Sequence, residues 1–144
     1  MKLYTIGFTK STAAHFFGRL IEAGVRRVID VRLHNTSQLS GFAKMPDLAW
    51  FLQSLGGIDC RHEPALAPTK DMLDDYKKNS GSWEDYEPRF RALIAERRIE
   101  TVLDPAALDG ACLLCSEATP HHCHRRVVAE YLREKWSGVE IGHL

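Results

Sequence analysis

The chain has 144 residues, and its 19 basic and 19 acidic side chains give it zero formal charge. Such a length supports one domain with a substantial core that needs neither disulfides nor a metal to hold it together. The zero net charge argues against a general electrostatic attraction to nucleic acid or to an anionic membrane, and leaves room only for a local basic patch.

The sequence contains no apolar run of the length that spans a bilayer, and its first residues, MKLYTIGF, lack the layout of a signal peptide. We therefore expect a cytoplasmic protein without a membrane partner. The four cysteines are typical of reduced thiols, metal ligands or redox groups in such a protein, rather than of a disulfide framework.

The first half of the chain alternates predicted strands and helices. In order, we expect a strand at Lys2–Ile6, a helix capped by Ser11 or Thr12 and ended by Gly24, a strand at Arg27–Val31, a loop at Leu33–Pro46, a helix at Asp47–Leu55 and a strand at Ile58–His62. Val28, Ile29 and Val31 form the near-continuous apolar run of a strand that is buried on both faces.

The second half continues the alternation. We expect a linker at Pro64–Thr69, helices at Asp71–Lys78 and from Trp83 to about Arg97, a weak strand or a continuation of that helix at Ile99–Leu103, a connection at Asp104–Gly110, a strand at Ala111–Cys115, a helix at Pro120–Trp136 and a strand at Val139–His143. Thr119 is a good N-cap for the last helix, and Pro120 suits its first position. Pro88 can split or kink the helix that begins at Trp83.

Strands and helices that alternate at this spacing predict one α/β domain over residues 1–144. We expect a three-layer sandwich in which helices cover both faces of a mainly parallel sheet. Ligands of such sheets sit outside the carboxyl ends of the strands, where connecting loops and helix N-termini converge. The residues that follow each strand are therefore the candidate functional residues.

The stretch CLLCSEATPHHCHRR, residues 112–126, has the highest density of reactive side chains in the sequence. Cys115 and Glu117 emerge at the end of a predicted buried strand, whereas Cys123, His124 and Arg125 fall in or next to the first turn of the last helix. Backbone N–H groups and the helix dipole favour a thiolate or a bound anion at such a place.

Our first hypothesis is an enzyme that binds an anionic, phosphate- or nucleotide-bearing ligand at this edge. Cys115 or Cys123 would be the nucleophile, and Glu117 or His124 would carry the proton. Arg32 and Arg125 would neutralise the anion with help from the N-terminus of the last helix. The predicted ligand-binding residues, all near strand ends or the last helix start, are Gly7, Asp30, Arg32, His62 and Arg125. In the structural alternative the two cysteines are buried hydrophobes, and the acidic residues form ion pairs with Arg32 or Arg125.

Two other classes of function stay open. A binding module without turnover would hold a metabolite, a nucleic-acid end or a partner loop at the same edge. A metal-binding protein would use Cys115, Cys123 and a histidine or Glu117, because Cys112 and Cys115 are three apart in a strand and point to opposite faces. The sequence predicts no particular cofactor, since no Gly-rich phosphate loop or dinucleotide fingerprint is present.

The aromatic residues of the helix predicted to begin at Trp83 are expected to belong to the hydrophobic core. Trp83, Tyr86 and Phe90 fall at helical spacing, which is more typical of packing than of a stacking platform. Phe42 lies in the polar loop and is expected to pack onto the core. His121 and His122 are expected to face solvent.

Four short motifs together resemble the family catalogued as domain of unknown function 488. They are TIG at residues 5–7, DVR at 30–32, LLCSE at 113–117 and CHR at 123–125. The resemblance extends over the whole chain and implies a small Rossmann-like fold with these motifs gathered on one edge. It implies no particular reaction.

Overall fold

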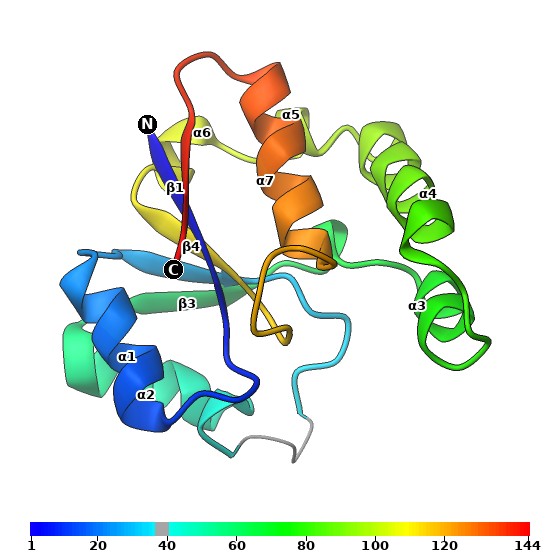
Figure 1. The fold of residues 1–144 in the computed structure, drawn as a ribbon. Helices are drawn as coiled ribbons and strands as arrows, with labels where there is room; N and C mark the ends of the chain where they lie inside the picture. The colour runs from blue at the N-terminus through cyan, green and yellow to red at the C-terminus, as the bar shows by residue number, and fades with distance from the viewer. Residues whose placement is uncertain (37–40) are drawn as a thin grey trace.

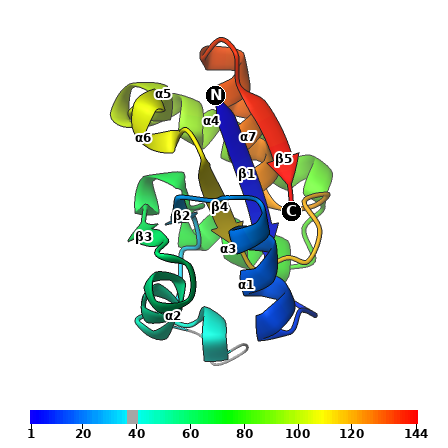
Figure 2. The same cartoon turned by 90° about the vertical axis from the view of Figure 1, so that its left-hand side faces the viewer.

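The structure, a computed structural model, describes residues 1–36 and 41–144. Five parallel strands form a single sheet in the order β3-β2-β4-β1-β5 (Figures 1 and 2). Their bounds are β1 (Lys2–Gly7), β2 (Arg27–Asp30), β3 (Asp59–His62), β4 (Ala111–Cys115) and β5 (Glu140–His143). The predicted α/β, Rossmann-like class is confirmed, and the sheet is entirely parallel.

Helices cover both faces of the sheet (Figure 1). One face carries α1 (Ala13–Glu22) and α2 (Asp47–Gly56), whereas α4 (Trp83–Glu96) and α7 (His124–Lys135) lie on the other. The remaining helices are α3 (Lys70–Lys77), α5 (Ile99–Val102), α6 (Pro105–Leu108) and the 3-10 helices at Gly41–Ala43 and Pro64–Leu66. The three layers therefore follow from two separate apolar cores, one on each side of the sheet.

Strand β4 shows how the sequence supplies both cores. All five of its residues are buried. Cys112 and Leu114 belong to the core under α1 and α2, and Leu113 and Cys115 belong to the core under α4 and α7. This alternation follows from the two-residue period of a strand. It confirms that Cys112 and Cys115 point to opposite faces.

Local capping signals set the ends of several helices. Of the two predicted caps for α1, Thr12 is the one used, and its side chain accepts a hydrogen bond from the His15 amide at 3.1 Å. Thr69 and Ser82 cap α3 and α4 in the same way. Gly57 ends α2 in the left-handed conformation, with φ of 62°. These side-chain and glycine caps explain why most helix bounds can be read from the sequence.

The predicted start of the last helix is wrong. Helix α7 begins at His124 with Cys123 at the N-cap position, not at Pro120 after Thr119. The Arg126 side chain donates hydrogen bonds to the carbonyl oxygens of Pro120 and His121, so those carbonyls are held in a loop conformation. Contacts from the helix itself thus override the local capping signal upstream.

The segment after α4 also differs from its prediction. Residues 99–102 form the separate short helix α5, neither a strand nor a continuation of α4, because Arg98 has a left-handed backbone with φ of 54°. Pro88 lies inside α4, and the helix is not split there. The predicted connection at 104–110 contains α6, which Asp104 caps.

The predicted loop at 33–46 contains the 3-10 helix Gly41–Ala43, and its residues 37–40 lie outside the described residues. Phe42 packs its ring 5.4 Å from that of Phe16 and 6.5 Å from that of Phe8, centroid to centroid. The expectation that it joins the core is confirmed. Across the described ranges, no helix has the length and apolar character that crossing a membrane requires.

Candidate functional site

A cavity of about 120 Å³ lies at the carboxyl edge of the sheet. Its floor is made by Cys115 at the end of β4 and by Cys123 and His124 at the start of α7. The other walls come from the loop after β2 and from helices α3 and α4. Five of the nine predicted site residues line this cavity: Arg32, Cys115, Glu117, Cys123 and His124.

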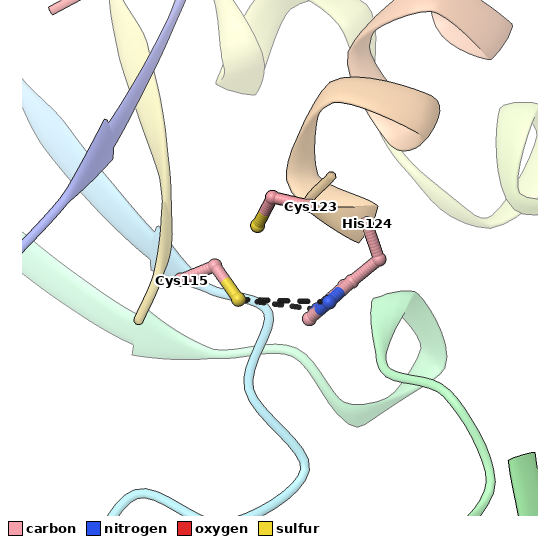
Figure 3. A group of neighbouring side chains, drawn as sticks. All are labelled: Cys115, Cys123 and His124. Carbon is pink, nitrogen blue, oxygen red and sulfur yellow. Dashed lines mark hydrogen bonds between the residues drawn. The ribbon is translucent and has the colours of Figure 1, made fainter. Parts of the chain in front are cut away.

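Cys115 and His124 face each other on the floor (Figure 3). The Cys115 Sγ atom lies 3.5 Å from His124 Nδ1 and 3.8 Å from Nε2. His124 Nε2 is also 2.8 Å from the carbonyl oxygen of Val31, which can only accept a hydrogen bond. The proton of a neutral His124 therefore sits on Nε2, and Nδ1 presents a lone pair on the side of the thiol.

Burial also sets the protonation of His124. The side chain is buried, and desolvation lowers its pKa below the ordinary 6.5. His124 is consequently a neutral imidazole at pH 7, which is the form that can accept a proton.

The two sulfur atoms on the floor differ in their electrostatic surroundings. Hydrogen bonding from the Cys123 thiol lowers the pKa of Cys115 against the opposing effect of burial, and the backbone amides of Ser116 and Glu117 and the charge of Arg125 add to the lowering. The pKa of Cys123 is raised, first by its hydrogen bond to Cys115 and then by burial. Cys115 is therefore the sulfur that ionises first, with Cys123 as its thiol donor.

Arg125 lies behind the floor and does not line the cavity. Its side chain is 1% exposed, and Nη1 donates to the Glu117 carbonyl oxygen at 2.7 Å and contacts Cys123 Sγ at 3.4 Å. Its buried Nε has no hydrogen-bond partner among the described residues. Arg125 thus supplies positive charge to the two thiols and holds the loop between them.

Gly7 allows two parts of the chain to pack closely together. A Cβ atom on this residue would lie 1.5 Å from the Glu117 carbonyl oxygen and 3.0 Å from Arg125 Nη1. The glycine therefore admits the loop that follows β4, and Gly7 does not line the cavity. The atoms that lie close to the Gly7 backbone belong to Glu117 and Arg125 of the same chain.

Asp30 and Arg32 form a buried ion pair. Arg32 Nε and Nη2 donate to the two carboxylate oxygens at 2.8 and 2.9 Å, and the Arg32 amide donates to Oδ1 at 3.1 Å. Asp30 is fully buried and does not line the cavity. The predicted ligand residue His62 is exposed, lies outside the cavity lining and donates through Nε2 to the Arg32 carbonyl oxygen at 2.7 Å. The buried Asp30–Arg32 pair matches the structural alternative, in which an acidic residue forms an ion pair with Arg32.

Glu117 lines the cavity but is engaged by another charge. Its Oε1 accepts a hydrogen bond from Lys77 Nζ at 3.0 Å, and about half of each side chain is exposed. Lys77 is on α3 and also lines the cavity. Both cations that we find in the lining, Arg32 and Lys77, thus have a carboxylate partner.

The sequence reasoning missed the aromatic wall of the cavity. Trp83 and Tyr86 line it, although their helical spacing was typical of core residues, and both are buried as that spacing predicts. His122 stacks on Trp83 with ring centroids 5.3 Å apart. His122 is exposed as predicted, yet it also lines the cavity. Helical periodicity cannot show which end of a buried face borders a cavity.

A metal ion could be held by the same floor residues. Donor atoms of Cys115, Cys123 and His124 all lie within 4.8 Å of one another. Zinc prefers thiolate and imidazole ligands. In metal-bound histidines, the ring nitrogen that does not bind the metal commonly donates its N–H to a backbone carbonyl, and His124 Nε2 has such a partner in Val31. The sequence favoured Cys115, Cys123 and either a histidine or Glu117 over a site with Cys112, and this set is the combination with a histidine.

Comparison with known proteins identifies the family and no individual relative. No curated protein and no solved structure matches the chain. The model of the family described as "Domain of unknown function DUF488" matches residues 12–132. The matched range contains the DVR, LLCSE and CHR motifs and begins after the TIG motif. Because the match covers most of the sequence, the chain belongs to the DUF488 family.

Proposed function

We propose that the protein is a thiol-dependent enzyme in which Cys115 attacks an electrophilic substrate and His124 carries the proton. The proposal rests on the relative positions of Cys115, His124 and the Val31 carbonyl group. The Cys115 thiol faces His124 Nδ1 at 3.5 Å, while the Val31 carbonyl fixes the opposite ring nitrogen at 2.8 Å. A nucleophile, a base and a group that orients the base are the parts that covalent catalysis requires.

The electrostatics of the floor support the same assignment. A lowered pKa at Cys115 increases the thiolate fraction at neutral pH, and the thiolate is the reactive form of cysteine. A lowered pKa at His124 keeps the imidazole neutral and able to take the Cys115 proton. His124 would then return this proton to the leaving group.

The lining favours an uncharged substrate over the phosphate-bearing ligand that the arginines suggested. Arg32 is held by Asp30, and Lys77 is held by Glu117, so neither cation needs a ligand for charge balance. Much of the remaining wall is aromatic or apolar, with Trp83 among its members. A small electrophile without net charge would enter without displacing either ion pair.

Site-resolved labelling tests the proposal. Folded protein is treated with iodoacetamide at neutral pH, and the four cysteines are followed by intact mass and peptide mapping. We expect one label on Cys115, which C115S abolishes. C112S is the matched control, because Cys112 is fully buried on the opposite face and its pKa is raised by burial. Labelling of Cys60 alone, or none at all, would overturn the proposal.

A metal centre is the second candidate, because three donor atoms converge within 4.8 Å. Titration of reduced protein with zinc ions distinguishes it from the first. A metal site predicts one zinc per chain, loss of that zinc in C123S, and protection of Cys115 from iodoacetamide. Unchanged labelling of Cys115 in the presence of excess zinc would exclude this candidate.

A further inference from the structure

Cys123 takes part in no bond-forming step of a one-thiol mechanism, yet its sulfur is placed beside the nucleophile. Cys115 and Cys123 both line the cavity, and their Sγ atoms lie within 4.8 Å of each other (Figure 3). Cys123 is next to the first residue of α7, and residues 116–122 between the two cysteines form no helix or strand. A disulfide between them requires only that this loop move, since β4 and α7 stay intact.

The two sulfur atoms also have different neighbours. Cys115 Sγ lies 3.5 Å from the basic Nδ1 of His124, whereas Cys123 Sγ is 3.4 Å from Nη1 of the buried Arg125. The first sulfur is thus prepared to attack. The second has a cation beside it that would stabilise its thiolate as it attacks or leaves in an exchange step.

We propose that the site reduces a hydroperoxide, with Cys115 as the attacking thiol and Cys123 as the thiol that resolves the product. The inference rests on the proposed function of Cys115 as nucleophile and names its substrate class. A hydroperoxide is small and uncharged, so it suits a cavity of about 120 Å³ whose lining cations are already paired.

The reaction balances in three steps. His124 Nδ1 takes the proton of the Cys115 thiol, the thiolate attacks the distal peroxide oxygen and the O–O bond breaks. The leaving alkoxide or hydroxide takes that same proton from His124, which leaves Cys115 as a sulfenic acid and His124 neutral. The Cys123 sulfur then attacks the Cys115 sulfur, which forms the disulfide and releases water. An external dithiol reduces this disulfide and is itself oxidised to a disulfide.

One equivalent of hydrogen peroxide added to reduced, folded protein tests the inference. We expect the loss of two thiols per chain and a peptide in which Cys115 is linked to Cys123. In C123S the reaction should stop at a sulfenic acid on Cys115, which dimedone traps, and C112S should behave as the unmodified protein. A Cys115 that goes on to sulfinic acid with Cys123 still reduced would overturn the resolving role.

His124 gives a second readout. Iodide leaves from iodoacetamide without a proton, whereas hydroxide or alkoxide leaves from a peroxide with one. H124Q keeps a donor for the Val31 carbonyl but has no basic Nδ1, so we expect it to slow peroxide oxidation by ~10²–10⁴-fold while Cys115 is still alkylated. Equal slowing of both reactions would contradict the proton-transfer step.

These results separate the two proposals. If Cys115 is alkylated in the folded protein but peroxide produces no link to Cys123, the hydroperoxide inference fails and the nucleophile stands. If Cys115 reacts with neither reagent, both fail.

Discussion

The absent side chain of Gly7 leaves the space that the Glu117 carbonyl oxygen occupies. Gly7 ends β1 next to Cys115 in the parallel register, and a Cβ built on it would lie 1.5 Å from that oxygen. The loop that holds the amides of Ser116 and Glu117 near the Cys115 sulfur can therefore follow its path only because residue 7 is glycine. A residue on one strand thus sets the environment of the thiol on the next.

Replacing Gly7 by alanine is expected to push the loop away from β1. The overlap should cost about 1–3 kcal/mol in the free energy of unfolding, the range found when a packed site is overfilled. Alkylation of Cys115 should slow as well, because its amide donors move. G18A is the control: nothing lies within 4 Å of its added methyl group, and alanine should stabilise helix α1 by about 1 kcal/mol. Urea unfolding and labelling rates measure both effects, and an unaltered labelling rate in G7A would contradict this account.

Asp30 is expected to be structural through its pair with Arg32. D30N leaves the buried guanidinium of Arg32 without its countercharge, and breaking such a pair typically costs about 3–5 kcal/mol in the free energy of unfolding. D74N serves as the control, because Asp74 pairs with the exposed Lys70 and Lys78, and the loss of such pairs should change stability little. A D30N protein as stable as D74N in denaturant unfolding would show that the buried pair does not hold the loop after β2.

The buried neutral imidazole of His124 predicts that stability falls in acid. Its folded pKa lies below the unfolded value of 6.5, so the unfolded chain binds more protons as the pH drops below 6.5. The free energy of unfolding should therefore decrease through this range down to the folded pKa, and above 6.5 the group should contribute no pH dependence.

H124Q tests the origin of that slope, because glutamine does not titrate. We expect the decrease in acid to become shallower without vanishing, since burial also lowers the pKa of His143. H122Q is the matched control, because His122 also lines the cavity but is exposed. The account is wrong on this point if H124Q and H122Q give the same pH profile as the unmodified protein.

Much of the fold could be predicted because its signals are local. The apolar run at Ala111–Cys115 predicted β4 with its observed bounds, and Thr12 supplied the expected cap for α1. The start of α7 could not be predicted in the same way. Thr119 and Pro120 have good capping chemistry, but hydrogen bonds from Arg126 hold the carbonyls of that segment in a loop. A tertiary contact decides that boundary.

The site was only partly predictable for a similar reason. Parallel strands bring Cys115 and His124 to the same edge, and this follows from topology. The sequence named His124 as a candidate proton carrier and expected His121 and His122 to face solvent, but the contact of His124 Nδ1 with the thiol depends on the path of the loop between β4 and α7, which spacing does not give. The cavity position of Trp83 depends on how α4 lies against the sheet, which helical periodicity also does not give.

The most direct test of the central claim is the pH dependence of the alkylation rate of Cys115 in the folded protein. We predict a midpoint below the ordinary thiol pKa of 9.0, and a rise in that midpoint in C123A, which lacks the principal hydrogen-bond donor to the thiolate. Cys60, whose pKa burial raises to about 12, provides an internal reference with the opposite shift. A Cys115 midpoint at or above 9.0, or a Cys115 that reacts only after unfolding, would contradict its assignment as the nucleophile.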